Sequence, residues 1–336
     1  MTSRLPRGST TLGLLAAAAL LAGCASATES ANDPASDSIS VVATTTILGS
    51  ITSDILACAD PNATVTTLMP IGADPHDFAP SSQQIAQMVG ADLVVANGLG
   101  LEAGLTDALA SAATDGATVL EVGEQVDPLP FGDHAGDAAA DDHAADGTAT
   151  DGTATDEHDQ GSDDPHVWFD MSRMATAAEI IGSTLAQTAG DTYATCGSQV
   201  ADEIRAAELD VRATMESVPA AKRILVTDHD ALGYLSDAYG YEIAGTVIPG
   251  GSTLGEPSSA DLAALVSVIQ AENVPAIFTN TASPTDLADA VAAETGRTIA
   301  VVPLFIGSLG DEASGADTYI TMMEKNASLI AQALNS

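Results

Sequence analysis

Short β-branched runs alternate with helical segments in two separate blocks of the chain, and this alternation is the strongest constraint on the fold. The runs are 39–48, 64–70, 91–98 and 117–123 in the first block, and 223–228, 241–248, 275–280 and 298–305 in the second. Strands separated by helices predict parallel sheets with helices on their faces. We therefore expect an α/β protein of two similar lobes, each a parallel β-sheet covered by helices.

Two helix starts within these blocks carry local signals. Ser81 followed by Gln84 is typical of a capping box, which predicts a helix from the next residue. In the second block, Ser283 is placed to cap a helix with Pro284 at its first position, and Gly296 is placed to end it.

The segment 191–220 lies between the blocks and predicts one uninterrupted helix of about five turns. Its apolar residues recur every three or four positions, and after Val200 no Gly or Pro occurs before Pro219. We expect this helix to connect an N-terminal lobe, 39–190, to a C-terminal lobe, 221–336. A helical connection is stiffer than short hinge loops, so large closure about it is not expected.

The first 23 residues predict a secretory signal, because two arginines precede an apolar run too short for a stable membrane anchor. The run ends in Leu21-Ala22-Gly23-Cys24, which resembles a bacterial lipobox. We expect Cys24 to carry a lipid that anchors the protein to the outer side of the cell membrane, with 24–38 as a flexible tether. The alternative is a signal with an incidental cysteine.

Cys58 and Cys196 are the other two cysteines. An exported chain meets conditions in which disulfides persist, and only one intramolecular pairing is available to it. Two inert buried thiols are the alternative. We predict the disulfide.

An acidic insertion, 132–164, interrupts the first block. It contains eleven acidic residues, a DGTAT repeat and no large apolar side chain, so it cannot bury a core. The bland interpretation is a solubilising loop. Its three histidines, His134, His143 and His158, instead favour weak metal capture.

Charge and missing motifs narrow the function. The chain has 47 acidic and 9 basic residues, which argues against nucleic acid as a partner and favours either cationic ligands or merely solubility. Neither HExxH, GxSxG, a phosphate-binding Gly-rich loop nor CxxC occurs. What remains is histidine placement: the tripeptide Asp-Pro-His ends at both His76 and His166, and His229 follows the run 223–228.

These three histidines are candidate metal ligands, although each alone is more often a turn or packing residue. Ligand groups gather outside the carboxyl ends of parallel strands, where His76 and His229 are expected. Neutral imidazole suits zinc, copper, iron or nickel. Affinity is expected to fall below about pH 6.5, the ordinary histidine value. Nearby acids that could orient the rings are Asp74, Asp77, Asp164, Asp228 and Asp230.

The motifs GADPHDFAPS, DPHVWFD, ILVTDHDALGYLSDAYGYE, GEPSSADLAALV and GADTYITMMEKN together resemble the bacterial ABC-transporter solute-binding lipoproteins for zinc and manganese. The resemblance runs from about residue 40 to the C-terminus, excluding the insertion. It implies two α/β lobes joined by a rigid helix, a monomer, and a metal held between the lobes and passed to a permease with its ATPase. His76, His166 and His229 fall on the family's three imidazole positions.

The chain departs from the family at the fourth ligand position, where Gly307 replaces a frequent Asp. The resemblance then leaves water, Asp311 or a residue of the acidic insertion as the fourth ligand. We expect a component of a metal importer without enzymatic activity. Zinc is the expected metal, because manganese prefers carboxylate and water oxygens. The alternatives are a manganese importer component, a zinc metallohydrolase using three His and water, and a surface adhesin or metal buffer.

Overall fold

The computed structural model describes residues 39–132 and 163–336. The expected signal segment, Cys24, the tether and the histidines His134, His143 and His158 lie outside these described residues. No helix within the described ranges combines the length and the apolar character needed to cross a membrane.

Two four-stranded parallel sheets form the framework, as the two blocks of the sequence predict. The first sheet has the spatial order β2 (Thr64–Thr67), β1 (Ser40–Ala43), β3 (Leu93–Ala96), β4 (Thr118–Glu121). The second has the order β6 (Glu242–Thr246), β5 (Ile224–Thr227), β7 (Ala276–Asn280), β8 (Ala300–Leu304). Every pairing is parallel, and both sheets follow the same connection pattern.

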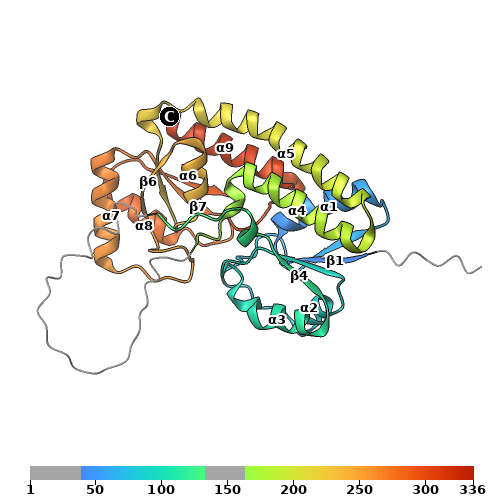
Figure 1. Cartoon of the computed structure of the whole chain (residues 1–336). Helices are drawn as coiled ribbons and strands as arrows, with labels where there is room; N and C mark the ends of the chain where they lie inside the picture. Colours follow the sequence, from blue (N-terminus) through green and yellow to red (C-terminus); the bar gives the residue numbers. More distant parts are fainter. Residues whose placement is uncertain (1–38, 133–162) are drawn as a thin grey trace, which may run out of the picture. The chain divides into compact units, whose positions relative to one another are not determined.

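Helices connect the strands and cover both faces of each sheet (Figure 1). Those of the first lobe are α1 (Thr46–Ala59), α2 (Ser82–Val89), α3 (Thr106–Asp115) and α4 (Met171–Ala189). The second lobe has α6 (Gly233–Tyr239), α7 (Ser259–Glu272), α8 (Asp286–Glu294) and α9 (Tyr319–Asn335). The capping box at Ser81 and Gln84 is confirmed at the start of α2.

Two local predictions were wrong. The run 39–48 is not a single strand, because the side chain of Thr45 accepts a hydrogen bond from the amide of Leu48 and starts α1 directly after β1. In the second block, α8 begins at Asp286 rather than Pro284, and its N-terminal flanking residue is Thr285, not Ser283. In both cases more than one Ser or Thr lies near the start of the helix.

Three groups of buried side chains make up the hydrophobic core. One lies between the first sheet and α2 and α3, and includes Val42 and Val94. Another lies between the second sheet and α7 and α8. The third and largest contains the opposite faces of both sheets, with residues such as Val41 and Phe278 in one continuous cluster. Because the lobes share this core, moving one against the other would expose apolar surface.

The expected connecting helix is α5 (Thr192–Glu216), whose 25 residues make about seven turns, more than the five anticipated. It contacts α1 and α4 of the first lobe and α6 and α9 of the second. Figure 1 shows α9 running beside part of α5, and the two helices contact each other, so the C-terminal segment supports the connection.

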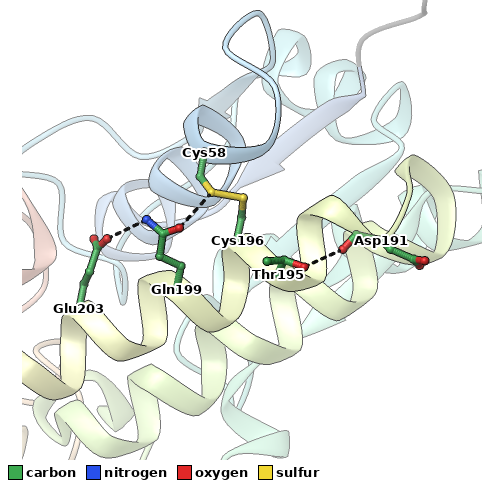
Figure 2. Close-up of a disulfide and its surroundings, with 6 residues drawn as sticks. All are labelled: Cys58, Asp191, Thr195, Cys196, Gln199 and Glu203. Atoms are coloured by element: carbon green, nitrogen blue, oxygen red, sulfur yellow. Dashed lines mark hydrogen bonds between the residues drawn. A yellow bond between two sulfur atoms is a disulfide. The ribbon is translucent and has the colours of Figure 1, made fainter.

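Cys58 of α1 and Cys196 of α5 form a disulfide in the structure, as predicted (Figure 2). Their Cα atoms are 5.8 Å apart, although 138 positions separate them in the chain. The bond therefore fastens the first helix of the N-terminal lobe to the connecting helix.

Candidate metal centre

His229 lies two residues beyond the end of β5, at the carboxyl end of the second sheet. Its backbone N–H and ring Nδ1 each lie 2.9 Å from Oδ1 of Asp228. The other oxygen of Asp228 accepts a hydrogen bond of 2.8 Å from the amide of Asn280, at the end of β7. The strand ends thus fix the carboxylate, and the carboxylate fixes the imidazole.

His166 is held in a similar way by Asp164. Its backbone N–H and Nδ1 lie 2.9 and 2.7 Å from Oδ1 of that residue. The backbone of Asp164 donates to the carbonyl of Leu129 at 2.7 Å and accepts from the hydroxyl of Tyr234 at 2.7 Å. The position of His166 therefore depends on residues from both lobes.

His76 lies on the long connection between β2 and α2, nine residues beyond the strand. Its backbone N–H donates to Oδ1 of Asp74 at 3.0 Å, and Oδ2 of Asp74 accepts a 2.6 Å hydrogen bond from Thr253 of the other lobe. The loop itself is fixed by Gly72, whose amide donates to Ser308 at 2.9 Å and whose φ of 80° suits glycine.

The three imidazoles converge on one point. Each offers a ring nitrogen, and these nitrogens all lie within 4.8 Å of one another. The Nε2 atoms of His76 and His166 are 3.3 Å apart. Four ligands at about 2.0–2.1 Å from zinc in a tetrahedron are about 3.3–3.4 Å from each other, so this spacing suits two such ligands. His76 is 9% exposed, and the other two are 1% exposed.

Burial keeps two of the rings neutral. Burial, and after it the neighbouring His166 and His229, lower the pKa of His76 to about 3 against smaller opposing effects of Asp74 and Asp228. The pKa of His166 is also well below its ordinary value, first because of burial and then because of His229. Neutral imidazole is the form that coordinates a metal ion.

The proton positions also fit a metal. An Nδ1–H that donates to Asp164 or Asp228 leaves the Nε2 lone pair of His166 or His229 directed away from that carboxylate. Within the described part of the chain, Nε2 of His229 is buried and has no hydrogen-bond partner. A buried nitrogen of this kind is costly unless a ligand satisfies it.

Only some of the five acids expected to orient the imidazole rings contact a ring nitrogen. Asp164 and Asp228 contact ring nitrogens, whereas Asp74 contacts the backbone of His76, and Asp77 is exposed. Asp230 is 5% exposed, and its negative charge raises the pKa of His166, partly offsetting burial.

No fourth His, Cys, Asp or Glu joins the imidazoles among residues 39–132 and 163–336. Asp311 is exposed, and its carboxylate accepts from the amide of Ser314 at 2.9 Å, at the start of a short 3₁₀ turn, η6 (Glu312–Ser314). The structure therefore does not bring Asp311 to the cluster.

Sequence reasoning missed three supporting residues, Tyr234, Thr253 and Asn280. Asn280 could have been found, because it ends the predicted strand 275–280 at the edge where ligands gather. Tyr234 and Thr253 carry no such signal, because their contacts with Asp164 and Asp74 link segments 70 and 179 positions apart.

Comparisons with known proteins identify the family of the chain. A family model described as zinc-uptake complex component A, periplasmic, matches residues 41–333. The zinc-binding protein TroA of Treponema pallidum is 29% identical over 310 residues, or 90% of this chain and 91% of that protein. The manganese-binding lipoprotein MntA of Halalkalibacterium halodurans is 25% identical over 325 residues, or 96% and 97% of the two chains.

Solved structures show the same fold. The periplasmic zinc-binding protein TroA from Treponema pallidum matches with a TM-score of 0.71 and 25% identity, over 88% of this chain and 99% of that one. A manganese-bound periplasmic metal-binding protein from Candidatus Liberibacter asiaticus matches in fold, with a TM-score of 0.69 at 22% identity over the same shares. The expected family is confirmed: the chain belongs to the zinc-uptake component A family of metal-binding proteins of ABC transporters.

Proposed function

We propose that this protein captures Zn²⁺ outside the cytoplasm and delivers it to a membrane permease with its ATPase. His76, His166 and His229 coordinate the ion, and a lipid on Cys24 holds the protein, as a monomer, at the membrane. The observation that carries the proposal is the cluster of three buried imidazoles whose nitrogens lie within 4.8 Å of one another.

The chemistry of this cluster favours zinc over manganese. Three imidazole nitrogens supply most of a tetrahedral zinc shell, and zinc has no d-electron preference that penalises water as the fourth ligand. Manganese prefers oxygen ligands, and no carboxylate joins the cluster among the described residues. Manganese is the second candidate, because several relatives are named for it.

Two other functions are separable by experiment. A metallohydrolase would need the three-histidine site to activate water, whereas the relatives are named as binding proteins. A metal buffer or adhesin would bind zinc equally well but would not support uptake in cells. Growth on limiting zinc, compared between a strain that lacks the gene and the same strain with the gene restored, distinguishes import from buffering.

The binding test is a competition titration of zinc, and separately of manganese, against a chelator of known affinity. Replacing any one of His76, His166 and His229 by Ala is expected to weaken zinc binding by orders of magnitude. The matched controls His134→Ala, His143→Ala and His158→Ala, in the insertion, are expected to leave the tight site almost unchanged. Near wild-type affinity in His166→Ala or His229→Ala would overturn the site.

A further inference from the structure

Glu102 carries a buried carboxyl group that the metal cluster does not use. The residue is 4% exposed, and it forms no ion pair with any described residue. Burial raises its pKa, although hydrogen bonds from neighbouring groups offset part of this effect. A buried acid without a cation is costly, so its presence calls for a structural or functional reason.

The carboxyl group holds the turn that follows β3. One oxygen accepts hydrogen bonds of 2.7 Å from the hydroxyl of Thr44 and 2.8 Å from the amide of Asn97, and the other accepts 3.1 Å from the amide of Gly98. The φ angles of Gly98, Leu99 and Gly100 are 79°, 55° and 77°. Leucine rarely adopts such an angle, so surrounding contacts must stabilise this turn.

Asn97 connects this turn to the metal cluster. Its backbone donates to Glu102, and its carbonyl accepts from the amide of Gly123 at 2.8 Å. Its side-chain nitrogen donates to the carbonyl of Gly98 at 3.2 Å and to the carbonyl of Pro165 at 2.9 Å. Both acceptors are carbonyl oxygens, so the nitrogen of the Asn97 side-chain amide must face them. This sets the orientation of the amide group.

The carbonyl of Pro165 belongs to the peptide bond of His166. The N–H of the same peptide unit donates to Asp164 at 2.9 Å, so both polar groups of the plane are fixed. Because a peptide unit is rigid, this fixes the position of the Cα of His166. The hydrogen bond from Nδ1 to Asp164 then fixes the ring, and with it Nε2.

We propose that Glu102 and Asn97 are positioning residues for metal binding, which act in series to place Nε2 of His166 against the other two imidazoles. Glu102 holds the backbone of Asn97, and the Asn97 amide holds the peptide unit before His166. The inference rests on the proposed function, because its test measures the binding of the metal ion that the three histidines coordinate.

The test uses the full mature chain and four variants: Asn97→Ala, Asn97→Asp, Glu102→Gln and the double variant Asn97→Ala/Glu102→Gln. Zinc affinity is measured by chelator competition, the visible absorption of the Co²⁺-loaded protein reports ligand geometry, and urea unfolding of the metal-free protein reports stability. The matched control is Tyr241→Phe, which removes a buried 2.8 Å hydrogen bond to the carbonyl of Met215.

Loss of an interaction that orients a metal ligand weakens metal affinity by about 10- to 100-fold. We expect this loss and a changed Co²⁺ spectrum in Asn97→Ala, with a larger loss in Asn97→Asp, whose carboxylate repels the Pro165 carbonyl. The double variant should bind zinc no more weakly than whichever of Asn97→Ala and Glu102→Gln has the lower affinity, because the two residues act in series. Tyr241→Phe should lose stability but keep zinc affinity within twofold.

Zinc affinity within twofold of wild type and an unchanged Co²⁺ spectrum in Asn97→Ala would overturn the proposal. So would additive losses in the double variant, or a similar affinity loss in Tyr241→Phe. If Glu102→Gln does not fold, Asn97→Ala and Asn97→Asp still decide. A failure of the proposed function is separate, since it would show as wild-type zinc affinity in His166→Ala.

Discussion

Pro75 occupies the space into which a side chain at residue 307 would project. A Cβ atom built on Gly307 would lie 2.7 Å from Cδ of Pro75, and 3.5 Å from the side-chain nitrogen of Asn280. The proline ring has no freedom to swing aside, and the next residue is His76. The glycine therefore does more than omit a ligand, because it also allows the loop that carries His76 to pack against the second lobe.

Gly307→Asp is therefore expected to weaken zinc binding rather than complete the ligand set. The new side chain must push Pro75 and His76 away, and overpacking of this kind typically costs about 1–3 kcal/mol. Pro75→Ala/Gly307→Asp should recover zinc affinity and gain affinity for manganese, because space for the carboxylate is restored. Chelator competition with both metals measures this, with Pro75→Ala as the control. A gain in manganese affinity without loss of zinc affinity in Gly307→Asp alone would contradict the steric argument.

The metal-free protein is expected to lose stability as the pH falls below about 6.5. The unfolded chain protonates its histidines near that pH, whereas the folded chain does not protonate His76 until its pKa of about 3. The unfolded state then binds more protons, so this residue lowers the free energy of unfolding by about 1.4 kcal/mol per pH unit between these values. His166 acts in the same direction.

Urea unfolding between pH 7.5 and 4.5 tests this, with His76→Ala as the comparison. The variant should show a shallower decline of stability with falling pH than wild type, and equal slopes would rule out the assignment.

The structure also changes the expected pH dependence of zinc binding. Because His76 stays neutral in the folded protein well below pH 6.5, protons should compete with zinc at this ligand only at lower pH.

Removal of residues 133–162 is expected to leave one tight zinc site. The two ends of the acidic insertion meet in the fold, because the amide of Asp164 lies 2.7 Å from the carbonyl of Leu129 and Pro130 pairs with Asp163. A short Gly-Ser link can therefore close the gap. Calorimetry should show that weak additional binding disappears while the tight site remains. Loss of the tight site would identify a residue of the insertion as its missing ligand.

Reduction of the Cys58–Cys196 bond is expected to lower stability without changing zinc affinity. The bond spans 138 positions, for which the chain-entropy model gives about 5 kcal/mol at most. Urea unfolding of Cys58→Ser/Cys196→Ser, beside a zinc competition titration, measures both quantities. Thiol titration of denatured, unreduced wild type should find no reactive thiol besides that of Cys24, and two more would show that the bond is absent.

The sequence predicted the framework because its signals are local. Each of the eight runs of β-branched and apolar residues contains one observed strand, since such residues favour strands. The disulfide was predictable for a different reason: with Cys24 set aside, only Cys58 and Cys196 remained.

The details of the metal centre depend on contacts between distant segments, which local patterns do not encode. The hydrogen bond from Thr253 to Asp74 joins the two lobes, and the contact between Pro75 and residue 307 is steric. Sequence reasoning gave Asp74 and Asp228 the same role, yet only Asp228 contacts an imidazole nitrogen. The three histidines that converge were thus readable from the sequence, but their supporting contacts were not.

The three imidazoles do not await an ion in the same way. Asp164 and Asp228 accept at Nδ1 of His166 and His229 and so leave Nε2 of each ring to coordinate, whereas Asp74 contacts the backbone of His76 and not its ring. The tautomer of His76 is therefore not set by this carboxylate, and its proton must be on Nδ1 for Nε2 to coordinate. His76 is also the most exposed of the three rings. Two of the three ligands are thus preset for an ion by the fold, and the tautomer of His76 is the part of the cluster that an incoming ion selects.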